Sequence, residues 1–77
     1  MPSPKIVWEI RPSKDRYTFD LISNELPFGC TSGYHYVAAA VRHAKAYSGS
    51  HPAVIRVYDA AGNVVETHEH DGDFQGP

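Results

Sequence analysis

One stretch of helical periodicity, with alternating segments on both sides of it, most constrains the fold of this chain. Over residues 36–47 the sequence YVAAAVRHAKAY places its apolar side chains along one stripe at the spacing of an α-helix. Gly49 can close this helix in a left-handed conformation, and Pro52 prevents its continuation. We therefore predict one helix, with a stripe formed by Val37, Ala40, Val41, Ala44 and Tyr47 or Ser48.

Two segments before the helix alternate between apolar and polar residues, as half-buried strands do. These segments are KIVWEIR at residues 5–11 and RYTFDLI at residues 16–22, and the residues between them are typical of a turn. An antiparallel hairpin with that turn pairs Trp8 with Phe19. One face of the hairpin is then aromatic and aliphatic.

A second hairpin is predicted after the helix, over residues 53–70. Its turn, DAAG, suits a type I turn with a bulge at the glycine. The resulting register pairs Arg56 with Glu66 and turns Val57 toward the core. Glu66 and His68 then share the outer face with Arg56.

The order of elements defines the fold class. A third, short strand is expected around residues 28–31, so the chain reads strand, strand, short strand, helix, strand, strand. We predict an α+β fold in which one helix packs across one face of an antiparallel sheet of four to five strands. The chain is expected to form a single domain over residues 1–77, ordered over about 5–70, with a mobile tail at 71–77. The predicted core is Trp8, Phe19, Leu21, Val41, Ile55 and Val57.

Cysteine content and hydropathy bear on the compartment. Cys30 is the single cysteine, which excludes an internal disulfide and favours a reducing environment. No apolar run approaches the roughly 20 residues of a membrane span, and residues 1–5 lack the apolar stretch of a signal peptide. We therefore expect a cytoplasmic protein.

The formal net charge of −2 hides an uneven distribution along the chain. All seven Lys and Arg residues lie at or before Arg56. The acids after that position are Asp59, Glu66, Glu69, Asp71 and Asp73. Such a division can create an acidic surface that attracts a charged partner.

The stretch ETHEHDGD at residues 66–73 raises the question of a metal site. On a strand, Glu66, His68 and His70 point the same way, with alternate side chains about 7 Å apart. His68 and His70 could therefore bind Zn²⁺ or Ni²⁺ weakly at the surface, but no third fixed ligand is identifiable. A solvated acidic strand end explains the same residues, and we predict no resident cofactor.

Signals for catalysis and for nucleic-acid binding are weak. Cys30 could be a nucleophile served by a histidine, but no catalytic motif surrounds it, and no glycine-rich phosphate loop is present. Tyr34, Tyr36 and Tyr47 lie near the cations of the helix and could stack on bases, but a net acidic chain lacks the usual basic footprint. We therefore expect no enzymatic activity.

The first half of the chain resembles the small bacterial YegP-like domains of unknown function. The shared pattern is Tyr-x-Phe-x-Leu in a hairpin, then Asn, then a Ser-x-Gly-Tyr turn that leads into an alanine-containing helix. The chain departs from it at Tyr36, where a capping Ser is expected, and at residues 25–27, which replace a Gly-containing turn. The closing hairpin is similar to that of another small uncharacterised domain with a strand–helix–strand layout. These resemblances imply the fold and carry no activity. The matching residues are Tyr17, Phe19, Leu21, Asn24, Thr31, Gly33, Tyr34, Ala38 and Ala39.

A small non-enzymatic protein-interaction module is the function that these observations favour. Its partner would be another protein or a second copy of the chain, bound through a sheet edge, surface tyrosines and the acidic C-terminal hairpin. One alternative is a phage-encoded or mobile-element-encoded inhibitor of the anti-CRISPR type, in which the acids of residues 59–73 mimic nucleic acid. Another is a regulator that binds metal or nucleic acid weakly. The predicted partner-binding residues are Glu66, Glu69, Asp71, Asp73, Tyr34 and Tyr36.

Overall fold

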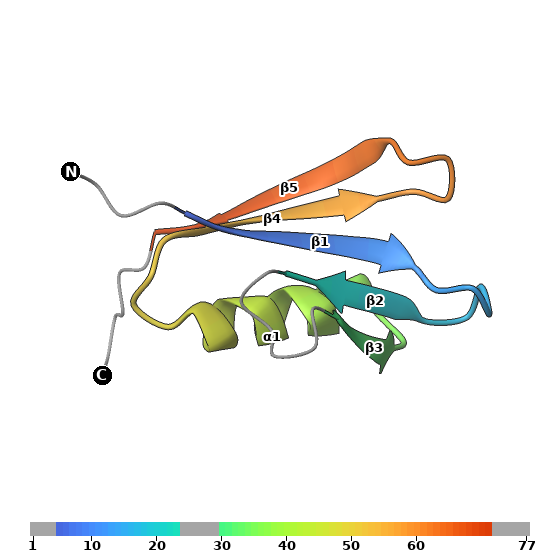
Figure 1. Ribbon diagram of the computed structural model, residues 1–77, viewed down its shortest axis with the longest axis horizontal. Coiled ribbons are helices and arrows are strands. Elements are labelled where there is room, and N and C mark those ends of the chain that lie inside the picture. The colour runs from blue at the N-terminus through green and yellow to red at the C-terminus, as the bar shows by residue number, and fades with distance from the viewer. Residues whose placement is uncertain (1–4, 24–29, 72–77) are drawn as a thin grey trace.

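Five strands and one helix make up the computed structural model, which describes residues 5–23 and 30–71 (Figure 1). The helix follows the third strand and precedes the fourth, as predicted from the sequence. Of the predicted third strand around residues 28–31, residues 28 and 29 lie outside the described residues. The elements are β1 (Ile6–Pro12), β2 (Phe19–Ile22), β3 (Cys30–Tyr34), α1 (Val37–Ser48), β4 (Ala53–Tyr58) and β5 (Val64–His70).

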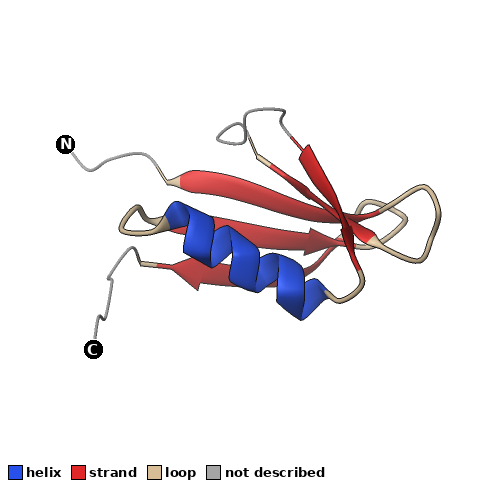
Figure 2. Ribbon diagram, turned by 90° about the horizontal axis from the view of Figure 1, so that it is seen from below, coloured by secondary structure: helices blue, strands red, loops and turns tan. Residues whose placement is uncertain are grey.

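The strands form a single sheet in the order β3-β2-β1-β4-β5. Three of the strand pairs are antiparallel, and β1 and β4 are parallel. The helix carries the chain back across one face of the sheet, so β4 enters beside β1 in the same direction (Figure 2). The predicted α+β fold is confirmed, with a mixed sheet in place of a wholly antiparallel one.

The first hairpin has a longer connection than the sequence suggested. β1 and β2 pair Ile10 with Leu21, so the predicted pairing of Trp8 with Phe19 is wrong. The turn includes residues 13–18, because the first amide of this segment donates to its last carbonyl at 2.9 Å. The shift is an even number of residues, so the predicted apolar face still points at the helix.

The second hairpin contains a bulge that moves the register by one residue. β4 pairs Val57 with Glu66, so the predicted pairing of Arg56 with Glu66 is wrong. Val65 is the additional residue at the register shift. Because a shift of one residue exchanges the two faces of a strand, Glu66 and His68 lie on the face that carries α1.

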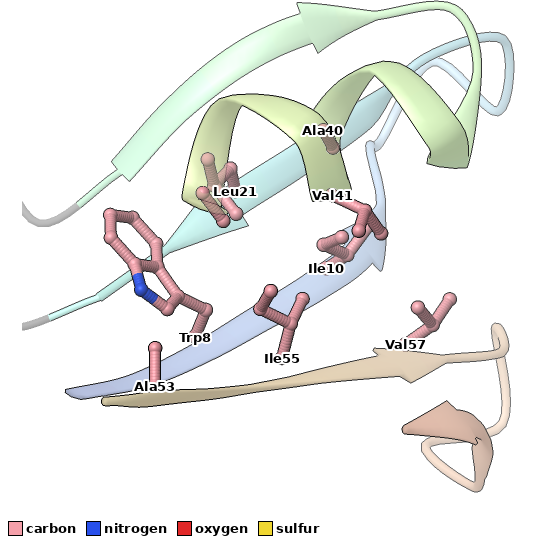
Figure 3. Packing of buried hydrophobic residues seen from close by; sticks show 9 residues of the cluster. Trp8, Ile10, Leu21, Ala40, Val41, Ala53, Ile55 and Val57 are labelled. Carbon is pink, nitrogen blue, oxygen red and sulfur yellow. The ribbon is translucent and has the colours of Figure 1, made fainter. Parts of the chain in front are cut away.

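The core lies between α1 and the sheet (Figure 3). Trp8, Leu21, Val41, Ile55 and Val57 are buried as predicted. Phe19 is only half-buried and packs against this cluster, because the observed register places it at the end of the hairpin. The other members of the cluster are Ile10, Ala40, Ala44 and Ala53.

A buried hydrogen bond joins the end of the helix to the centre of the sheet. The indole Nε1 of Trp8 donates to the hydroxyl of Ser48 at 2.9 Å, and that hydroxyl donates to the carbonyl of Ala44 at 2.8 Å. The ring of Tyr47 lies edge-on to the indole, with centroids 5.6 Å apart. Of the two alternatives for the end of the helical stripe, Ser48 is the buried one.

The two ends of α1 are closed differently. Gly49 ends the helix with φ 57° and ψ −120°, so its φ is positive as predicted but its ψ is not that of the left-handed conformation. Its amide donates to the carbonyl of Lys45 at 3.2 Å. Tyr36 occupies the N-cap position, and its side chain makes no capping hydrogen bond. Within the described residues, no helix has the length and apolarity needed to cross a membrane.

Candidate interaction site

Strand β5 is an exposed strand at the edge of the sheet. It pairs with β4 on one side, and no described strand pairs with its other side. All seven of its residues are exposed or half-buried, including Val64 at 49% and Val65 at 55%. An edge of this kind presents backbone N–H and C=O groups that can pair with another strand.

The opposite edge of the sheet is less suited to strand pairing. β3 has five residues, and its register with β2 is irregular. Gly33 in this strand has a φ of 98°, far from extended geometry. Short and irregular edge strands resist the addition of further strands, which leaves β5 as the better candidate.

A groove of about 370 Å³ separates β5 from α1. The helix contributes apolar side chains and two cations to it, and the strand contributes Glu66 and His68. These two side chains form a hydrogen bond in which Nε2 of His68 lies 2.9 Å from Oε1 of Glu66. The helical side of the groove consists of Val37, Ala38, Val41, Arg42 and Lys45.

Arg42 and Lys45 are the groove residues that sequence reasoning missed as part of a site. The sequence alone indicates an ordinary solvated helix face for both residues. Their spacing of three residues, next to the apolar Val41, was the available signal for a common charged flank. Because the predicted strand register placed Glu66 on the other face of the sheet, no acidic side chain was expected beside these two cations.

The acids predicted to bind a partner do not share one surface. Glu66 lies on the face that carries α1, whereas Glu69 pairs with Val54 and lies on the opposite face. Asp71 is exposed directly after β5, and Asp73 lies outside the described residues. The histidines of β5 alternate with the two glutamates, so the strand presents no continuous acidic row.

The two predicted tyrosines lie on different elements. Tyr34 ends β3, and its hydroxyl forms a hydrogen bond with Nδ1 of His43 on the helix. Burial raises the pKa of the Tyr34 phenol. Tyr36 is 73% exposed. β3 and β5 are opposite edges of the sheet, so Tyr34 lies away from the acidic strand. Tyr36 directly precedes Val37, which lines the groove beside β5.

The two histidines proposed as metal ligands have other partners. Nε2 of His70 lies 2.7 Å from the carbonyl oxygen of Gly49, and Nε2 of His68 faces Glu66. Since a carbonyl and a carboxylate only accept, both nitrogens carry protons in this arrangement. Over residues 5–23 and 30–71, no group of three or more His, Cys, Asp or Glu side chains is placed to hold a metal ion. Metal binding at His68 and His70 stays a prediction.

Comparison of this chain with models of protein families, with curated proteins and with solved structures gave no match. The resemblance to YegP-like domains therefore stays a prediction.

Proposed function

We propose that this chain is a small non-enzymatic protein-interaction module of the cytoplasm, which binds its partner by pairing a strand with β5. The observation that carries the proposal is the seven-residue exposed edge of β5. Strand addition obtains affinity from main-chain hydrogen bonds and specificity from alternate side chains. The single cysteine supports the reducing compartment.

A second copy of the chain is the partner that the sequence of β5 fits. In an antiparallel pair centred on Thr67, Glu66 lies opposite the partner's His68, and the same contact is repeated by symmetry. Thr67 then lies opposite the partner's Thr67, which is a favourable cross-strand pair. Registers centred on Glu66 or on Glu69 instead place two carboxylates opposite each other.

This pairing accounts for the residues of β5 better than nucleic-acid mimicry does. An inhibitor that mimics nucleic acid needs acids spaced along one surface, whereas His68 separates Glu66 from Glu69 and these two acids lie on different faces. In the symmetric pairing, the alternation of glutamate and histidine brings Glu66 opposite the partner's His68. It also places both helices on the same face of a continuous sheet, because residues directly opposite in a ladder point to the same side.

The oligomeric state of the full chain tests the proposal. We expect sedimentation velocity over a concentration series to detect a dimer. His68→Glu should raise the dimer dissociation constant about two- to thirty-fold, since each of the two lost cross-strand pairs contributes about 0.2–1 kcal/mol. Exchanging the two residues, with Glu66→His and His68→Glu together, should restore association.

The matched control is Ser32→Glu, which adds the same charge at an exposed position of the opposite edge strand. It should leave the dimer unchanged. A chain that stays monomeric at all concentrations contradicts the proposal. So does an exchange variant that associates no better than His68→Glu alone.

A further inference from the structure

The turns that follow β1 and β4 enclose a cleft of about 780 Å³, distinct from the edge of β5. Because β1 and β4 are parallel neighbours, their carboxyl ends meet at the same end of the sheet. The β1–β2 connection and the β4–β5 turn leave the sheet side by side there, on the right in Figure 1. The cleft is lined by Arg11, Pro12, Ser13, Lys14 and Arg16 on one side and by residues 59–62 on the other.

Three cations face this cleft against one acid. Arg11, Lys14 and Arg16 all line it, and Asp59 is the only carboxylate among the lining residues. Oδ1 of Asp59 accepts the amides of Ala61 at 2.9 Å and of Asn63 at 2.8 Å. This carboxylate is therefore directed at its own turn. Glu9 pairs with Arg11 at 2.8 Å, so Lys14 and Arg16 give the cleft its excess of positive charge.

Arg11 is held in a defined position at the cleft. Its Nε donates to Oε1 of Glu9 at 2.8 Å, and its guanidinium lies 3.9 Å from the centre of the Tyr58 ring. These contacts leave the terminal guanidinium nitrogens without another hydrogen bond among the described residues. A guanidinium fixed in this way loses little further conformational entropy when it binds an anion.

The backbone of Arg16 provides an independent reason to assign a role to its side chain. Its φ is 66°, and among the described residues it is the one non-glycine residue with positive φ. This conformation suits glycine, asparagine or aspartate and is unfavourable for a long side chain. The connection keeps it in place, since the amide of Arg16 donates to the carbonyl of Ser13 at 3.0 Å and Asp15 accepts the amide of Tyr17 at 2.9 Å. Strained residues of this kind occur at ligand-binding sites.

We propose that this cleft binds the phosphate groups of a small phosphorylated molecule, with Arg11, Lys14 and Arg16 as the anion-binding residues. A compact group of cations in an open cleft matches the charge density and the acceptor geometry of a diphosphate. The rest of the surface lacks the extended basic footprint of a nucleic-acid-binding protein, since the formal net charge of the chain is −2. This site does not depend on the pairing of β5.

The test is a titration of the full chain with sodium pyrophosphate, followed by ¹H–¹⁵N NMR at constant ionic strength, with sodium chloride as the reference. We expect saturable shifts of amides in residues 13–17 and 59–62. Arg16→Gly should weaken binding about tenfold, because one charge-assisted contact is lost. The same substitution should raise the melting temperature, because glycine relieves the strained backbone. Loss of binding therefore cannot result from unfolding.

Two further variants complete the test. Arg16→Lys keeps the charge and should bind pyrophosphate nearly as well as the parent chain. Lys5→Gln removes an exposed cation that precedes β1, at the end of this strand opposite the cleft, and should change nothing. The proposal is overturned if pyrophosphate and chloride give the same shifts, or if Arg16→Gly binds as tightly as the parent. A single-stranded oligothymidine that binds where pyrophosphate does not would overturn the assignment to a small ligand.

Discussion

The buried contact between Trp8 and Ser48 offers the sharpest test of how the helix is attached to the sheet. Trp8 is fully buried and Ser48 is 2% exposed, so water cannot replace a lost hydrogen-bond partner. In Ser48→Ala the indole Nε1 loses the acceptor that lies 2.9 Å away. The carbonyl of Ala44 loses only a second donor.

The magnitude follows from the cost of an unsatisfied buried donor. Leaving such a group without a partner costs about 1–3 kcal/mol. The higher helix propensity of alanine offsets about 0.5 kcal/mol at most, since residue 48 is the last of the helix. We therefore expect Ser48→Ala to lower the free energy of unfolding by about 1–2.5 kcal/mol, a large part of the stability of a domain this small.

A double-mutant cycle isolates the contact. In a Trp8→Phe background the donor is absent, so Ser48→Ala should cost less than about 0.5 kcal/mol, and the coupling energy should be about 1–2 kcal/mol. Urea unfolding followed by far-ultraviolet circular dichroism measures all four chains, since tryptophan fluorescence is lost in two of them. Ser50→Ala is the matched control, an exposed serine that should change stability by less than about 0.5 kcal/mol. Equal costs of Ser48→Ala in the two backgrounds would refute the reasoning.

Two other predictions concern the helix cap and the hairpin turn. Tyr36→Ser should raise the free energy of unfolding by about 0.5–1 kcal/mol in thermal melts, because a serine at this N-cap can accept a helical amide. A less stable variant would show that the exposed ring supports the fold. For Asp59, the backbone amide of Asn63 holds the carboxyl pKa below its usual 3.8. A folded-state pKa below the unfolded value stabilises the fold above pH 3.8 and loses this effect as the pH falls through the folded value. Urea midpoints of Asp59→Asn should therefore fall less than those of the parent chain on acidification, and parallel curves would contradict this.

The secondary-structure elements and most of the core could be predicted from the amino-acid pattern alone. The helix was predicted over residues 36–47 and is observed at Val37–Ser48, and the hairpin strands were found by their alternation. Trp8, Leu21 and Ile55 were assigned to the core for the same reason. These features are local, because the spacing of apolar residues within one segment indicates both the type of element and the face that it buries.

Strand register was decided by contacts that the apolar pattern does not encode. In the first hairpin an even shift keeps Trp8 and Leu21 on the buried face, so the alternation of the sequence is satisfied by more than one pairing. In β5 both faces are largely solvated, so burial does not select among registers, and the bulge at Val65 sets which face carries Glu66.

Both candidate sites depend on those tertiary decisions. The groove beside β5 exists because the bulge places Glu66 and His68 on the face of the sheet that α1 covers. Arg42 and Lys45 of the helix line the same groove. The cleft with Arg16 exists because β1 and β4 are parallel neighbours, which joins two turns that are more than 40 residues apart in the chain. Which strands become neighbours depends on how the whole core packs against the helix, and no single segment determines this. The sequence therefore showed the acids and cations but not which of them face each other.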